Sequence, residues 1–297
     1  MTWLRQRVGD LLGQPVEESR PVGGGSICDA HRLRLADGRT VFAKTLDRAP
    51  ADFFRTEADG LRLLGRLVEV PEVWAVEDEL LVLEWVEPGP ADPAQAERLG
   101  RRLAALHQRP VDHFGAASAS DGTPHRAGYL ASLPLAAPDV PIGDPGRWGA
   151  FHAEYRLLPL LRAAVDRGAL GPADAAVVER LCERLGDLAD PQPPRLIHGD
   201  LWAGNVHWAA DGRARLIDPS AQGGHPEADL AMLELFGCPA LDHLLGAYQE
   251  VRPTPGRAAR VPLHQLHPLL AHAVLFGGGY GARSAAAARA ALSALGA

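Results

Sequence analysis

The sequence predicts an α+β protein with two lobes, in which an N-terminal lobe built on an antiparallel sheet with one helix precedes a mostly helical C-terminal lobe. Three observations support this prediction. Strand-like alternation and turn residues dominate the first 86 residues, prolines and glycines cluster over residues 84–93, and apolar residues recur with helical spacing beyond them. We therefore expect one lobe over residues 1–86, a linker near residues 84–93 and a second lobe over residues 87–297.

Size and charge limit the classes of function that the chain can have. Its 297 residues are 46% hydrophobic and 23% charged, which is typical of a globular protein with a substantial core. The formal net charge of -7 argues against nucleic acid as a partner, because proteins that bind polyanions concentrate Lys and Arg on one face. We expect a small-molecule or protein substrate.

The chain also lacks the signals of a membrane or secreted protein. Residues 1–13 form a short amphipathic pattern, which favours a first helix over a signal peptide. No apolar run approaches the roughly 18 residues that a membrane span requires. Three isolated cysteines, Cys28, Cys182 and Cys238, favour reduced thiols over a disulfide framework. We therefore expect a cytoplasmic protein without a membrane partner.

A glycine-bearing β-hairpin is expected next. Alternating apolar residues over 31–35, an Asp37-Gly38 turn and a second strand over 40–45 predict the hairpin. The loop that leads into it contains four small residues: Gly23, Gly24, Gly25 and Ser26. Glycines between two strands let backbone N–H groups approach a phosphate, and a serine hydroxyl can add a donor. On its own a triple glycine is more often a flexible turn.

Lys44 ends the second of these strands, where an ammonium could reach the phosphates of a nucleotide. Helical spacing over residues 53–64 then places Glu57 where it could pair with Lys44 and set its direction. The alternatives are a solvated lysine at a strand end and a solvated glutamate. For Cys28 we expect an unreactive thiol, because its only basic neighbour is His31.

The second half of the chain contains two apolar stripes with helical spacing. Ala96, Leu99, Leu103 and Leu106 form the first stripe, and Val177, Leu181, Leu185 and Leu188 form the second. Residues 112–147 between them have no clear period, so we expect a long surface excursion that shapes the substrate pocket. Gly277-Gly278-Gly279-Tyr280 is expected to end a helix.

The most informative segment is His198-Gly199-Asp200-Leu201-Trp202-Ala203-Gly204-Asn205. Its H-x-D-x4-N spacing is typical of a phosphoryl-transfer loop, in which the Asp accepts a proton from the attacking hydroxyl and the Asn helps to hold magnesium. A hairpin through the Asp211-Gly212 turn would bring Asn205 beside Asp218, a second hard oxygen ligand. His198 is expected to support the loop by hydrogen bonding. The other histidines have no trustworthy metal-ligand spacing and are interpreted as structural: His107, His225, His264, His267 and His272.

These segments resemble the fructosamine kinases, also called ketosamine 3-kinases, within the aminoglycoside phosphotransferase and choline kinase-like group. The loop at residues 198–205 is similar to the family's H-G-D-L-W-(S/A)-G-N, and Leu216-Ile217-Asp218-Pro219 is similar to its I-D-P. Further similar blocks are residues 224–232 (G-H-x-E-x-D-L-A-M), residues 275–280 (L-F-G-G-G-Y), and residues 148–159, with W-x-x-F and R-L-L-P. The resemblance covers roughly residues 20–281.

The resemblance implies a two-lobed protein kinase-like fold and transfer of the ATP γ-phosphate, with Mg²⁺, to the 3-hydroxyl of a ketoamine. In that interpretation Asp200 is catalytic, Asn205 and Asp218 bind magnesium, and the glycine loop, Lys44 and Glu57 belong to the ATP site. Adenine would meet the backbone of four residues: Leu83, Glu84, Trp85 and Val86. Trp202 and His225 become candidate substrate residues, although Trp202 could instead only pack beside the loop.

Two alternatives stay open. One is a kinase of another hydroxylated amine, such as an aminoglycoside or a choline-like compound, and the other is a nucleotide-binding pseudokinase. The stretch over residues 133–138, Leu-Pro-Leu-Ala-Ala-Pro, departs from the polar stretch of many relatives and leaves the choice of acceptor open. Ser26 stands where some relatives have cysteine, so no redox switch is carried over to Cys28.

Overall fold

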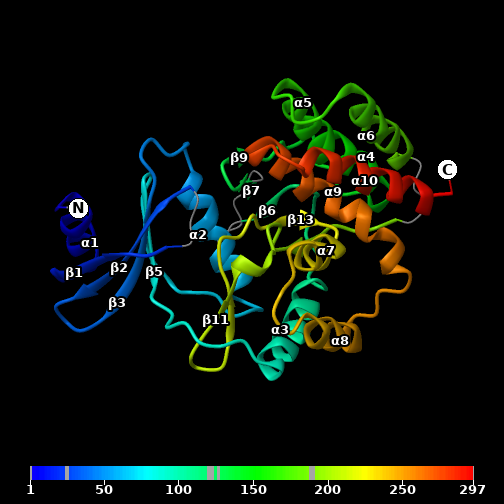
Figure 1. Cartoon of the computed structure of the whole chain (residues 1–297). Helices are drawn as coiled ribbons and strands as arrows, with labels where there is room; N and C mark the ends of the chain where they lie inside the picture. Colours follow the sequence, from blue (N-terminus) through cyan, green and yellow to red (C-terminus); the bar gives the residue numbers. More distant parts are fainter. Residues whose placement is uncertain (1, 24–26, 119–123, 126–127, 187–190, 297) are drawn as a thin grey trace.

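The protein has two lobes joined by a short connection (Figure 1). A computed structural model describes residues 2–23, 27–118, 124–125, 128–186 and 191–296. The N-terminal lobe contains the larger sheet and the C-terminal lobe contains most of the helices, so the predicted α+β architecture is confirmed.

The N-terminal lobe is built on a five-stranded antiparallel sheet with the order β1-β2-β3-β5-β4. Its strands are β1 (Val16–Pro21), β2 (Asp29–Leu35), β3 (Thr40–Thr45), β4 (Val73–Val76) and β5 (Leu80–Glu84). The expected β2–β3 hairpin is present, with Ala30 opposite Lys44. Four of the five residues of β5 are buried, because helices cover both faces of the sheet.

Two helices, not the single one expected, belong to this lobe. Helix α1 (Thr2–Leu12) packs Leu4 and Val8 against one face of the sheet, beside Val41 and Leu80. Helix α2 (Phe53–Leu64) covers the other face with a second apolar cluster. The prediction of one helix was wrong because the first helix buries its apolar side against the sheet and is therefore part of the lobe.

Helix α3 (Pro93–Leu106) follows the connection and begins where local chemistry favours a helix start. The side chain of Asp92 accepts a hydrogen bond of 2.9 Å from the amide of Gln95, and Pro93 occupies the first turn. The predicted stripe of α3 is buried. It packs with Leu63 and Leu64 of α2, so a single apolar cluster spans both lobes.

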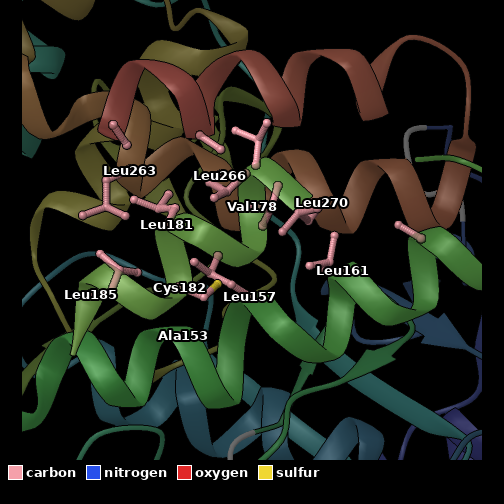
Figure 2. Packing of buried hydrophobic residues seen from close by; sticks show 14 of the residues in the cluster. Ala153, Leu157, Leu161, Val178, Leu181, Cys182, Leu185, Leu263, Leu266 and Leu270 are labelled. Carbon is pink, nitrogen blue, oxygen red and sulfur yellow. The ribbon is translucent and has the colours of Figure 1, made fainter. Parts of the chain in front are cut away.

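The C-terminal lobe is mostly helical, and most of its helices share one apolar core. Its helices after α3 are α4 (Trp148–His152), α5 (Leu158–Asp166), α6 (Pro172–Leu185), α7 (Glu227–Phe236), α8 (Leu241–Val251), α9 (Arg257–Phe276) and α10 (Tyr280–Ala294). Figure 2 shows apolar side chains of α5, α6 and α9 meeting in this core. Helix α6 ends at Leu185, and Leu188, the last residue of the expected stripe, lies outside the described residues.

Residues 112–147 were expected to lie on the surface, and this is wrong for part of the segment. They include the short strands β6 (Ala117–Ser118), β7 (Pro124–His125), β8 (Tyr129–Leu130) and β9 (Leu133–Pro134), and the 3-10 turn η1 (Pro145–Arg147). Phe114 is fully buried and stacks on Phe151, while Leu130 is 4% exposed. Apolar side chains without a period thus anchor an irregular segment to the core.

The polar segment that joins α6 to α7 along the chain consists of short strands and turns. They are β10 (Arg195–Ile197), the 3-10 turn η3 (Ala203–Asn205), β11 (Val206–Trp208), β12 (Ala214–Leu216) and β13 (Gln222–Gly224). Strand β10 pairs with β13, and β11 pairs with β12 as the predicted hairpin. The turn at Gly277-Gly278-Gly279 ends α9 as expected, and α10 follows it. None of the helices in the described ranges combines the length and apolar character of a bilayer span.

Candidate active site

Strand β10 delivers the catalytic-loop motif to the edge of the C-terminal lobe. Leu196 is fully buried, which holds the strand in place just before His198. The ring of His198 donates from Nε2 to the carbonyl of Ile217 at 3.0 Å, and its Nδ1 accepts the amide of Asp200 at 3.2 Å. Burial lowers the pKa of His198, so the ring is neutral. His198 therefore supports the loop by hydrogen bonding, as predicted.

The β11–β12 hairpin brings Asn205 and Asp218 together. Val206 pairs with Leu216, and the amide of Ile217 donates to the carbonyl of Asn205 at 3.1 Å. Asn205 thus precedes the hairpin and Asp218 follows it, which is the arrangement that the sequence predicts. Asp218 has φ of 53°, in the left-handed region that non-glycine residues adopt at some cost, and its carboxylate contacts Lys44 of the other lobe.

Asp200 and Asn205 form a hydrogen-bonded pair. The side-chain amide of Asn205 donates to the carbonyl of Asp200 at 2.8 Å and to its Oδ2 at 3.2 Å. Burial, together with the nearby carboxylate of Asp218, raises the pKa of Asp200 to about 7. A carboxylate poised near neutrality and oriented by an amide is suited to accept a proton.

Lys44 connects the two lobes at the site. Its Nζ lies 3.0 Å from both carboxylate oxygens of Glu57 and 2.8 Å from Oδ1 of Asp218. Burial alone would lower the pKa of Lys44, but the two carboxylates outweigh it and raise the pKa. For Glu57, burial raises the pKa to about 7, and the charge of Lys44 opposes this effect. The contact of Lys44 Nζ with both carboxylate oxygens at 3.0 Å is that of an ion pair. The predicted pairing of Lys44 with Glu57 is therefore present.

A buried aspartate that the sequence patterns did not single out accepts hydrogen bonds from the backbone of the loop. Asp229 of α7 is 1% exposed and accepts the amides of His198 at 2.8 Å and Gly199 at 2.9 Å. His107 donates to it at 3.0 Å and is itself bonded to Tyr248 at 2.9 Å. Burial by itself would raise the pKa of Asp229, yet these donors hold it below its ordinary value. The available signal was its place in the G-H-x-E-x-D-L-A-M block.

The connection between the lobes is bound to the same hairpin. His207 donates from Nε2 to the carbonyl of Val86 at 3.0 Å, and the amide of Gly89 donates to the carbonyl of Trp208 at 2.9 Å. The amide of Glu84 donates a hydrogen bond to the carbonyl of Glu72 at 2.8 Å. The carbonyl of Val86 and the amide of Glu84 are thus already engaged within the protein, and Leu83 and Glu84 also pair with β3 in the sheet.

The remaining predicted ATP-site residues are only partly described. Gly23 is exposed and follows Val22, whose amide donates to the carbonyl of Ala30 opposite Lys44. Gly24, Gly25 and Ser26 lie outside the described residues. Burial raises the pKa of the Cys28 thiol to about 11, which agrees with an unreactive cysteine.

The two candidate substrate residues differ in exposure. The side chain of Trp202 is 40% exposed and lies against Gly204 and Phe236. His225 is 5% exposed, between the rings of Trp148 at 4.9 Å and His264 at 4.4 Å. Burial of His225 favours the structural interpretation over a direct contact with substrate.

His225 belongs to a buried polar cluster that sequence spacing did not predict. One potential ligand atom each of His225, Glu227 and His264 lies within 4.8 Å of the others. Both carboxylate oxygens of Glu227 accept hydrogen bonds from Arg260. The Nδ1 of His225 accepts a hydrogen bond from the amide of Glu227 at 3.1 Å. A cation would have to compete with these bonds, so the donor set fits a structural role better than a metal centre.

Asn205 and Asp218, in contrast, fit magnesium. Both N–H groups of the Asn205 amide face Asp200, which leaves its Oδ1 as the atom to offer a cation. Asp218 adds a carboxylate whose side chain is 42% exposed. Hard oxygen ligands of this kind are those that magnesium prefers.

The two lobes, the cross-lobe lysine and the Asp-Asn-Asp set define a phosphotransferase with the protein kinase-like fold. The fold extends to distant phosphotransferases: a macrolide 2'-phosphotransferase of Brachybacterium faecium superposes with a TM-score of 0.56 at 20% identity, covering 97% of this chain and 96% of that one. At this identity the likeness shows the fold alone.

The chain belongs to the fructosamine kinase family, whose model matches residues 2–294. A protein of Thermus thermophilus named a probable ketoamine kinase is 41% identical over 264 residues, which cover 88% of each chain. A crystal structure from Thermobifida fusca, provisionally named a fructosamine-3-kinase, superposes with a TM-score of 0.87 at 46% identity and covers 99% of each chain. The chain is thus a kinase that transfers phosphate to a hydroxyl group.

Proposed function

We propose that this kinase uses ATP with Mg²⁺ to phosphorylate the 3-hydroxyl of a ketoamine, such as a fructosyl or ribulosyl group on an amine. Its role would be the repair of glycated amines, free or on proteins. The observation that carries the proposal is the convergence of Asp200, Asn205, Asp218 and Lys44 from both lobes, in a chain of the fructosamine kinase family.

In the proposed reaction Asp200 accepts the proton of the acceptor hydroxyl as its oxygen attacks the γ-phosphorus. The new bond joins that oxygen to phosphorus, and the bond to the bridging oxygen of ADP breaks with its electron pair. Asn205 holds the Asp200 carboxylate in place through the bond of 3.2 Å. Lys44, fixed by Glu57, provides the positive charge for the nucleotide phosphates.

The magnesium site is assigned to Asn205 and Asp218. These two oxygen-bearing side chains would hold the ion, which would supply positive charge next to the nucleotide phosphates. Lys44 binds Asp218 directly at 2.8 Å, so its ammonium would have to share or release this carboxylate when the nucleotide enters.

The test is a panel of acceptors offered with Mg-ATP: fructosyl-lysine, ribulosyl-lysine, kanamycin and choline. ADP release would report turnover, and phosphorus NMR would locate the phosphate. Phosphate on the 3-hydroxyl of a ketoamine is the expected result. Turnover only with kanamycin or choline would show that the acceptor is another hydroxylated amine and not a ketoamine. ATP binding without turnover on any acceptor of the panel would favour the pseudokinase alternative.

A further inference from the structure

Helix α2 belongs to the N-terminal lobe, yet the C-terminal lobe contacts it at three places along its length. The helix packs on the sheet with one side and lies between the sheet and the C-terminal lobe (Figure 1). Near its end, Leu63 and Leu64 join the apolar cluster of α3. In its middle, a Cβ atom on Gly60 would lie 3.1 Å from the ring of Pro219. The third contact is at its first turn.

The contact at the first turn of α2 comes from residues 128–136, which we call the interlobe strap. Within it the β8–β9 hairpin pairs Tyr129 with Pro134. The ring of Tyr129 lies 5.0 Å from the ring of Phe53, and its hydroxyl donates to the carbonyl of Ala51 at 3.3 Å. Tyr129 thus packs against the apolar cluster of the N-terminal lobe, although the strap follows the connection between the lobes.

Gly128 lets the strap approach the helix closely. A Cβ atom at residue 128 would lie 2.3 Å from Cγ2 of Thr56 and 3.2 Å from its Cβ. Thr56 cannot rotate away without loss of a hydrogen bond, because its hydroxyl donates to the carbonyl of Asp52 at 2.8 Å. A side chain at residue 128 would therefore push the strap and α2 apart.

The strap is itself held in the C-terminal lobe by two buried donors that bind its backbone. The hydroxyl of Ser220 donates to the carbonyl of Tyr129, and the guanidinium of Arg156 donates to the carbonyl of Ala136 at 2.6 Å. Breaking either bond would leave a buried donor unsatisfied, which is costly. The strap is therefore fixed to the C-terminal lobe at both of its ends.

Backbone strain marks both sides of this contact. Asp52, just before α2, has φ of 65°, and Ala131, in the turn of the strap, has φ of 55°. Non-glycine residues adopt this region at some cost, and such conformations persist only where the surrounding contacts hold them. The contact between Tyr129 and Phe53 thus joins two segments whose conformations are strongly constrained.

We infer that the interlobe strap positions Glu57 for its contact with Lys44, and that Tyr129 is the positioning residue. Phe53, against which Tyr129 packs, lies four residues before Glu57, so the two residues lie on the same side of α2. The strap therefore fixes the turn that precedes Glu57 to the C-terminal lobe. The inference rests on the proposed assignment of Lys44 and Glu57 to the ATP site, and it does not depend on the acceptor.

The strap also contacts the segment that carries the second carboxylate of Lys44. Ser220, which bonds the strap, lies two residues after Asp218, and Asp218 binds Lys44 at 2.8 Å. The strap thus holds together the two segments whose carboxylates bind the ammonium. An ammonium that is held from two sides has less conformational freedom to lose when it binds a phosphate.

The experiment is a double-mutant cycle on the dissociation constant of Mg-ATP, measured by calorimetric titration. Tyr129→Ala should weaken binding by about 3- to 30-fold, the range typical of coupled residues. In a Glu57→Gln background the same change should alter binding by less than about twofold, because α2 then no longer directs Lys44 through a charge. Tyr129→Phe keeps the ring and should restore binding to within about twofold of the wild-type value.

A second variant tests the strap without removing the tyrosine. Gly128→Ala adds one methyl group against Thr56 and should weaken Mg-ATP binding as Tyr129→Ala does. Two control variants match these changes within the C-terminal lobe. Tyr155→Ala removes a ring that stacks on Phe151, and Gly171→Ala adds a methyl group that meets nothing within 4 Å. Both should bind Mg-ATP as the wild-type protein does, and thermal melting would show which variants are folded.

The possible outcomes separate this inference from the proposed function. Wild-type affinity in a folded Tyr129→Ala or Gly128→Ala variant would overturn the inference and leave the proposed function standing. Equal losses for Tyr129→Ala in the wild-type and Glu57→Gln backgrounds would also overturn it, because the strap would then act without Glu57. A wild-type protein that does not bind Mg-ATP would overturn both.

Discussion

Gly199 is the point of the catalytic loop that approaches the backbone of another segment most closely. Its φ is 83°, and a Cβ atom there would lie 2.3 Å from the carbonyl oxygen of Ser220. A side chain would therefore meet both an unfavourable backbone conformation and an atom that cannot move away cheaply. The loop and the segment after Asp218 can approach this closely only because the residue is glycine.

Gly199→Ala and Gly38→Ala separate these two effects. Gly38 has a similar φ of 87°, but an added Cβ atom would meet nothing within 4 Å. We expect Gly38→Ala to lower the free energy of unfolding by about 1 kcal/mol through the backbone alone. Gly199→Ala should cost more, by about 1–3 kcal/mol for the overlap, and should impair turnover. Urea unfolding checks this; equal losses in the two variants would contradict the role of the Ser220 contact.

Asp200→Asn tests the proton acceptor. The change keeps the size of the side chain but removes its basicity, so we expect turnover to fall by about 10²- to 10⁴-fold. ATP affinity should change little, because the group acts mainly in the transition state. Single-turnover kinetics and nucleotide titration measure the two quantities. Asp242→Asn, at an exposed position of α8, is the control, and wild-type turnover in Asp200→Asn would remove this residue from the mechanism.

At the scale of elements, Asp229 connects three helices to the loop. It lies on α7, bonds His107 after α3, and through His107 reaches Tyr248 on α8. Because these groups are buried, loss of one partner leaves the others unsatisfied. The loop geometry at Asp200 thus depends on how these helices pack.

Asp229→Asn and Tyr248→Phe provide a graded test of this connection. Tyr248→Phe removes the hydroxyl that bonds His107 at 2.9 Å and, more weakly, Arg252 at 3.5 Å, and should cost about 1 kcal/mol. Asp229→Asn removes a charge that accepts three bonds and should cost about 2–3 kcal/mol or more. It should also lower kcat while ATP binding is kept. Chemical denaturation and steady-state kinetics give both values, and normal kcat in a folded Asp229→Asn variant would exclude a positioning role.

At the scale of the whole molecule, buried histidines make stability depend on pH. Burial lowers the pKa of His152 to about 3 and holds the pKa values of His225 and His264 well below the ordinary value. Both ring nitrogens of His264, and Nε2 of His152, have no hydrogen-bond partner in the described structure. Since the unfolded chain protonates near pH 6.5 and the folded cluster does not, protons favour unfolding.

Stability should therefore be full above about pH 6.5 and fall as the pH decreases below it. Each such histidine contributes up to about 1.4 kcal/mol per pH unit in that window. Urea midpoints between pH 7.5 and 5 measure the slope. His264→Leu should flatten the slope by one proton, whereas His243→Leu, at an exposed histidine on α8, should leave it unchanged. An identical slope for His264→Leu would contradict this origin.

The local patterns of the sequence predicted much of this molecule. The β2–β3 hairpin, α2, α3 and the β11–β12 hairpin follow from alternation, helical spacing and turn residues, which act between neighbours in the chain. The pairing of Lys44 with Glu57 could be predicted for the same reason, because one turn joins their elements. The burial of α1 against the sheet of the N-terminal lobe and the buried part of residues 112–147 were missed, because partners distant in sequence decide whether a segment is covered.

The sequence by itself therefore determined the family, the two-lobed architecture and the chemical groups of the candidate site, because each depends on short segments of neighbouring residues. Only the tertiary structure decided the contacts between distant residues. Lys44 meets Asp218 across 174 positions, and Asp229 of α7 accepts the backbone amides of the catalytic loop. The physical reason is that packing of whole elements places these groups, and periodicity along the chain carries no information about which surfaces will meet.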